Sequence, residues 1–82
     1  MPKDYRVTNS FENDERNRCV DIVQRPDGRY GFQEWRREPE DLSGWFLMFD
    51  SQPTHFESEP EAISCARSAI FWFMEKYPAC PR

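Results

Sequence analysis

A single predicted hairpin constrains the fold of this chain more than any other feature. Two strand-like runs, Cys19–Gln24 and Arg29–Arg37, flank a short turn that contains Pro26 and Gly28. Pro26 presets the backbone angle φ for the first central position of a turn, and Gly28 accepts a left-handed conformation that most residues resist. The turn therefore sets the register of two antiparallel strands, and the register decides which side chains face the core.

If Arg25 pairs with Arg29, Ile22 lies opposite Phe32 on one face and Cys19 lies opposite Trp35 on the other. The first face is the more apolar near the turn, so we expect it to face the core. We expect the opposite face to be displayed, with three arginines and a tryptophan among its members: Arg25, Arg29, Gln33, Trp35 and Arg37.

The run Trp45–Phe49 is apolar at every position and predicts a third strand. An acidic loop interrupted by Pro39 and Gly44 precedes it. A strand with this pattern is central in its sheet or covered on both faces, or its outer face meets another molecule. The pattern alone leaves these alternatives open.

A helix is predicted from Ser58 to about Tyr77. Ser58 and Glu61 have the spacing of a capping box, and Pro78 ends the helix. At 100° per residue, one stripe of this helix is apolar: Ile63, Ala66, Ile70, Phe73 and Tyr77.

These elements predict an α+β fold in which a three-stranded antiparallel sheet packs on one C-terminal α-helix. The helix stripe would pack over Val20, Ile22, Tyr30, Phe32 and alternate residues of the third strand. Residues 1–17 are polar, and we expect a disordered N-terminal segment followed by a single domain at 18–82.

Composition and cysteine usage indicate a cytoplasmic protein. The chain carries a net charge of −4, which disfavours non-specific binding to nucleic acid or to an anionic membrane. No apolar stretch resembles a secretory signal or a membrane span. The three cysteines (Cys19, Cys65 and Cys80) are an odd number without a close pair, which favours free thiols in a reducing compartment.

No catalytic, cofactor-binding or metal-binding motif is recognisable, so we do not expect an enzyme. One histidine and three scattered cysteines do not form a metal-ligand set. Cys65 lies in the middle of the predicted helix, away from the end that activates a thiol, and His55 is typical of a solvated loop. The three glycines do not form a phosphate-binding loop.

A protein-interaction module is the function that we expect, with self-association as one form of it. Phe71 and Trp72 point away from the apolar stripe, and exposed aromatic rings are typical of interfaces. Together with Trp35 they are the candidate partner-binding residues. Alternatively, Phe71 and Trp72 cover one of the chain termini, through Tyr5 or Phe11 at the N-terminal end or residues 79–82 at the other.

Nucleic-acid binding is the alternative function. The displayed sheet face would straddle a phosphate backbone, with Trp35 stacking and Gln33 or an arginine contacting base edges. The candidate residues are Arg25, Arg29, Gln33, Trp35 and Arg37.

Two resemblances are carried by these segments. The chain resembles small bacterial β-β-β-α proteins of uncharacterised function at Arg25–Trp35, Gly44–Trp45 and Phe56–Ala66, about half of its length. That resemblance implies a fold and no activity.

The chain is also similar, more loosely, to plant-type AP2 and integrase-like three-stranded DNA-binding domains. The similarity lies at Gln24–Pro26, Gly28–Tyr30, Trp45 and Glu61–Ala62. It implies a sheet face that enters the major groove through Arg25, Arg29, Trp35 and Arg37. The chain departs from that family at Asp27, in its acidic third loop and in its overall charge, which favours shared architecture over shared activity.

Overall fold

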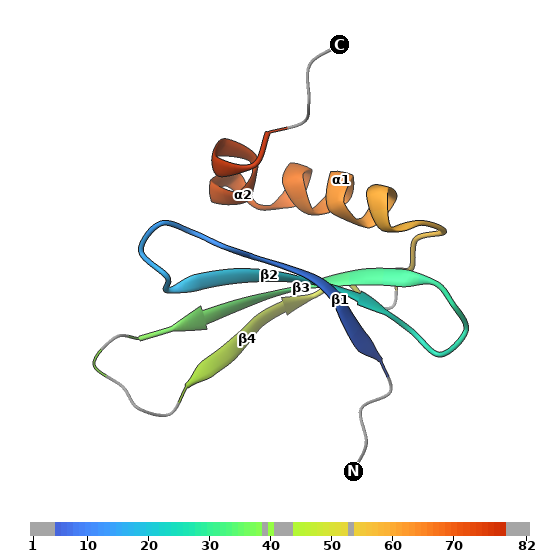
Figure 1. Ribbon diagram of the computed structural model, residues 1–82, viewed down its shortest axis with the longest axis horizontal. Helices are drawn as coiled ribbons and strands as arrows, with labels where there is room; N and C mark the ends of the chain where they lie inside the picture. Colours follow the sequence, from blue (N-terminus) through green and yellow to red (C-terminus); the bar gives the residue numbers. More distant parts are fainter. Residues whose placement is uncertain (1–4, 39, 41–43, 53, 79–82) are drawn as a thin grey trace.

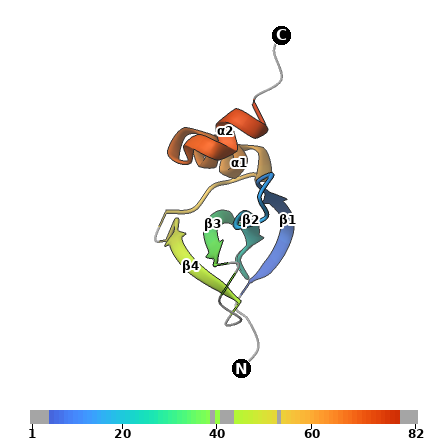
Figure 2. The same cartoon turned by 90° about the vertical axis from the view of Figure 1, so that its left-hand side faces the viewer.

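A computed structural model describes residues 5–38, 40, 44–52 and 54–78 and shows an antiparallel four-stranded sheet with two helices on one face (Figures 1 and 2). The strands lie side by side in chain order: β1 (Arg6–Glu12), β2 (Arg18–Gln24), β3 (Tyr30–Arg37) and β4 (Trp45–Asp50). The helices are α1 (Glu59–Ala69) and α2 (Phe71–Lys76). β1 and β4 are therefore the edge strands of this sheet, whereas α1 packs over β2 and β3.

The β2–β3 hairpin has the predicted register. Ile22 pairs with Phe32, and Cys19 pairs with Trp35. The Arg25 backbone N–H donates a 2.7 Å hydrogen bond to the Arg29 carbonyl, and Gly28 has the positive φ, 91°, that the turn requires. The sequence thus determines the central pair of strands through one turn.

The hydrophobic core lies between this hairpin and the helices. Its sheet side consists of Val20, Ile22 and Phe32, all at most 2% exposed. Its helix side consists of small and large apolar side chains in the predicted stripe and its flank: Ala62, Ala66, Ile70 and Phe73. The two alanines are fully buried, so that the backbone of α1 approaches the sheet closely.

The prediction of a three-stranded sheet after a disordered N-terminal segment is wrong, because Arg6–Glu12 forms a fourth strand. β1 pairs with β2 and contributes Phe11, whose ring lies 5.0 Å from the rings of both Phe73 and Tyr77. Thr8 donates a 2.8 Å hydrogen bond to Glu59 at the start of α1. These contacts join β1 to the helices, and they are invisible to an analysis of local composition. Residues 1–4 of the predicted segment lie outside the described residues.

The prediction of one continuous helix is also wrong. α1 starts as expected, with the Ser58 hydroxyl accepting the Glu61 N–H at 3.3 Å. The helix is interrupted at Ile70, where φ is −123° and ψ is 108°, and α2 continues from Phe71. Neither glycine nor proline causes the break. The change of direction brings Phe73 against Phe11 of β1, so tertiary packing outweighs the local preference for helix.

Candidate interaction surface

β4 differs from the other strands because its apolar side chains are half-exposed. Phe46, Leu47, Met48 and Phe49 are 45%, 49%, 47% and 48% exposed. They are consecutive, and they lie on an edge strand that pairs with β3 alone among the described residues. The prediction that alternate residues of this strand would pack beneath the helix is wrong except at Phe49, whose ring lies 5.6 Å from that of Phe32.

The exposed run presents apolar groups on both faces of the sheet. Phe46 is paired with Arg36, on the face that the helices cover further along the sheet, and Leu47 is paired with Trp35 on the opposite face. Glu34 pairs with Phe49 and Trp35 with Leu47, so Met48 is an extra residue that forms a bulge in β4 and shifts the register of the two strands. Phe46 and Met48 border a shallow hollow of about 350 Å³, together with Arg36 and Glu38.

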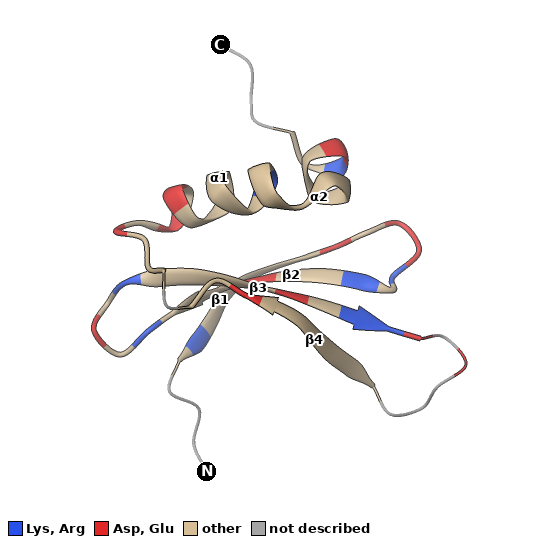
Figure 3. Cartoon of the chain, turned by 180° about the vertical axis from the view of Figure 1, so that it is seen from behind, with Lys and Arg blue, Asp and Glu red and all other residues tan. Residues whose placement is uncertain are grey.

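The run carries no charge. Figure 3 shows β4 as a tan strand beside the charged end of β3. The Arg37 guanidinium lies 4.7 Å from the centre of the Trp45 ring at the start of the strand, a cation–π contact. Arg37 also donates a 2.7 Å hydrogen bond to the Arg16 carbonyl, so it is bound to its own chain.

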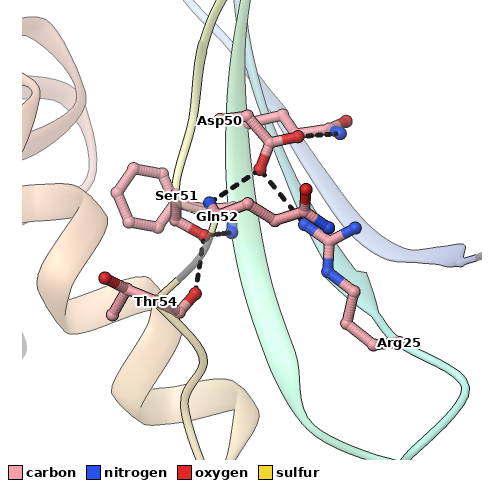
Figure 4. A network of polar contacts seen from close by, with 7 residues as sticks. Arg25, Asp50, Ser51, Gln52 and Thr54 are labelled. Atoms are coloured by element: carbon pink, nitrogen blue, oxygen red, sulfur yellow. Dashed lines mark hydrogen bonds and ion pairs between the residues drawn. The ribbon is translucent and has the colours of Figure 1, made fainter.

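A polar network anchors the other end of β4 (Figure 4). The Asp50 carboxylate accepts hydrogen bonds from Arg25 at 3.1 Å, from the Gln33 amide at 2.9 Å and from the Gln52 backbone N–H at 3.0 Å. Burial opposes ionisation of Asp50, but these hydrogen bonds and the Arg25 charge outweigh it, so the pKa of Asp50 lies below its ordinary value. The strand is therefore fixed to the sheet independently of its apolar side chains.

The next residue, Ser51, completes the anchor. Its hydroxyl accepts the Phe32 N–H at 3.1 Å and donates to the Thr54 carbonyl at 3.4 Å (Figure 4). Gly31 makes this approach possible, since a Cβ atom there would lie 2.7 Å from the Ser51 oxygen. A side chain at Gly31 would therefore force the Ser51 hydroxyl out of this position.

The structure does not display all of the residues that were predicted to contact nucleic acid. Arg25 and Gln33 are buried, at 8% and 3% exposed, and both are bound to Asp50, which corrects the expectation that the whole set would be displayed. Arg29 is exposed and paired with Asp27. Trp35 and Arg37 are half-buried. The five residues therefore do not form one accessible basic surface.

The three predicted partner-binding aromatic residues lie in different environments. Phe71 is 69% exposed. Trp72 is partly buried and donates a hydrogen bond of 3.2 Å from its indole nitrogen to Glu34. Trp35 lies beside Leu47 on the face opposite the helices. The alternative that Phe71 and Trp72 cover a chain terminus can be followed only at the N-terminal end, where the Phe11 ring lies beside those of Phe73 and Tyr77. At the other end, residues 79–82 lie outside the described residues.

A second hollow, of about 330 Å³, lies on the face opposite the helices. Trp35 and Trp45 line it together with Cys19 and Asp21. Burial is the main cause that raises the pKa of the Cys19 thiol to about 11, and the hydrogen bond and negative charge of Asp21 raise it further. Together they outweigh a hydrogen bond with Ser10, which lowers this pKa. This thiol is therefore protonated at neutral pH and is a poor nucleophile.

The described residues include no group of three or more His, Cys, Asp or Glu side chains that could hold a metal ion. Within the same part of the chain, no helix is both long and apolar enough to cross a membrane. A scan against protein-family models found no match, and searches of the curated proteins and of the solved structures found no significant one. The two resemblances drawn from the sequence therefore remain predictions.

The exposure of β4 was missed because a buried strand has the same continuous apolar pattern as Trp45–Phe49. The signal that could have identified it is that the sequence predicts no further strand between Trp45–Phe49 and the helix start at Ser58. Of the alternatives that the sequence left open, a central strand and a strand covered on both faces are excluded, because β4 is an edge strand with half-exposed side chains.

Proposed function

We propose that this protein is a small, non-enzymatic protein-interaction module of the cytoplasm that binds its partner along the edge of β4. The observation that carries the proposal is the run of four half-exposed apolar side chains on an edge strand. An edge strand presents unpaired backbone N–H and C=O groups, and a partner strand that pairs with them buries the adjacent side chains.

The cost of leaving such an edge uncovered supports this proposal. Natural sheets protect their edges with charged side chains, prolines or bulges, because an apolar edge promotes unwanted pairing. β1, the opposite edge strand, follows this rule with exposed polar residues such as Arg6, Asn9 and Glu12. β4 has a bulge but no charge among its first five residues.

Two of the aromatic residues singled out in the sequence lie outside the buried core. Trp35 pairs with Leu47 and extends the candidate surface, whereas Phe71, on α2, is the most exposed large apolar side chain of the described residues. Trp72 instead connects α2 to the sheet, because its indole N–H donates a hydrogen bond to Glu34 of β3. The unpaired Cys19 and Cys65 support the assignment to a reducing compartment.

Site-specific photocrosslinking in the native host tests the proposal. A photoreactive residue in place of Phe46 should form a covalent adduct with a defined protein, which mass spectrometry then identifies. The same residue in place of Val7, an exposed position on β1, is the matched control and should give no such adduct. The proposal fails if position 46 yields no protein adduct, or if position 7 yields the same adducts in equal amounts.

A further inference from the structure

We infer that the partner of the β4 edge is a second copy of this chain, paired antiparallel with β4 around a two-fold axis. This inference rests on the proposed function and names the occupant of its binding surface. The axis would be perpendicular to the sheet, so that two four-stranded sheets join into one continuous sheet with all helices on the same face.

The first argument is complementarity on both faces of the sheet. A strand added at this edge places side chains beside Phe46 on one face and beside Leu47 on the other. A well-matched partner strand must therefore be apolar on both faces, which is rare because most strands alternate. β4 itself has this pattern from Trp45 to Phe49, so a second copy supplies apolar neighbours to Phe46, Leu47, Met48 and Phe49.

The second argument is charge. Residues close to a two-fold axis face themselves or their neighbours in the partner, so a charged residue there would meet its own charge. The middle of β4, Leu47 and Met48, is uncharged, and so are Trp45, Phe46 and Phe49 around it. Asp50, at the far end of the strand, is neutralised by Arg25 of its own chain. Among the described residues of β4, self-pairing thus brings no like charges together.

The third argument is that the anchored geometry of β4 already suits pairing. The Asp50 and Ser51 network holds the strand in the sheet without help from its outer side chains. The free edge is therefore preformed, and a partner does not have to order it on binding. A polar β1 edge leaves no second apolar edge through which the dimer would extend, so the assembly closes at two copies.

Area determines how strong this dimer is. A phenylalanine side chain has a surface of about 200 Å², so the four half-exposed side chains offer on the order of 350 Å² per protomer. Stable interfaces bury about 800 Å² per partner. We therefore expect a weak dimer, with a dissociation constant of about 1–100 µM.

Analytical ultracentrifugation of the full chain tests the inference over about 1 µM to about 1 mM. The wild-type protein should change from monomer to dimer, and amide hydrogen exchange of β4 should slow as the dimer forms. Met48→Glu and Met48→Lys should each raise the dissociation constant at least about tenfold, because like charges then meet near the axis. An equimolar mixture of these two variants should dimerise more tightly than either alone.

Val7→Glu, on the polar β1 edge, is the control and should dimerise like the wild type. A wild type that stays monomeric throughout, a species larger than a dimer, or a mixture of the two Met48 variants no tighter than either alone overturns the inference. A monomeric wild type whose position 46 still crosslinks to a different protein overturns the inference alone and leaves the proposed function intact. If the wild type neither dimerises nor crosslinks at position 46, both the inference and the proposed function are overturned.

Discussion

β2 and β4 are both rich in apolar residues, yet only β2 is buried. Val20, Ile22 and Val23 of β2 are fully buried, whereas Phe46, Leu47 and Met48 of β4 are nearly half-exposed. The difference arises from position, because β2 has a strand on each side and α1 above it, while β4 has β3 on one side only. Apolar composition therefore indicates burial only when the neighbouring elements are known. In β4 the apolar residues are available to a partner.

The largest expected effect that tests this contrast is on stability. Phe73→Ala should lower the free energy of unfolding by about 4 kcal/mol, since Phe73 is fully buried and its loss leaves a cavity. Phe46→Ala should cost less than about 1 kcal/mol when the protein is dilute and monomeric. Urea denaturation followed by circular dichroism measures both. Equal losses for the two variants would show that β4 belongs to the core of the monomer.

A smaller effect is expected at the anchored end of β4. Asp50→Asn removes the negative charge beside Arg25, whose side chain is only 7% exposed, and should destabilise the fold by about 2 kcal/mol. This loss is smaller than the full cost of breaking a buried ion pair because solvent screens Asp50, which is itself 25% exposed. Chemical denaturation of the variant measures the loss.

The surface pair of Asp27 and Arg29 provides the control for this effect. Both side chains are about half-exposed, at 48% and 49%, so Asp27→Asn should change stability much less than Asp50→Asn. If the two substitutions have the same effect, the Asp50 network does not anchor β4, and the preformed edge must have another cause.

The hairpin and the helix start could be predicted from the sequence because each is determined locally. Pro26 and Gly28 fix one turn, and Ser58 caps one helix, so contacts within a few residues decide the outcome. β1 could not be predicted in this way. Its strand depends on Phe11 reaching Phe73, far along the chain, and on pairing with β2.

The candidate surface was predictable only in part. The apolar run of β4 is visible in the sequence, and contact with another molecule was one of the alternatives it left open. Its exposure depends on the end of the sheet and on where α1 lies, which local patterns do not contain. The burial of Arg25 and Gln33 was missed for the same reason, because both are bound by Asp50 from a strand that is distant in sequence.

The smallest effect that we expect is a pH dependence of the same anchor. The pKa of Asp50 lies below its ordinary value of 3.8 in the folded protein, so the folded state favours the ionised carboxylate. This contribution to stability is fully present above about pH 4 and is lost as the pH falls from 3.8 through the lower pKa of the folded state. Thermal unfolding between neutral and acidic pH should show a loss for the wild type that is smaller for Asp50→Asn, since the amide does not titrate. Parallel pH profiles for the two proteins would mean that ionisation of Asp50 does not contribute to the stability of the fold, and that β4 is held to the sheet by its backbone pairing with β3 and by Ser51.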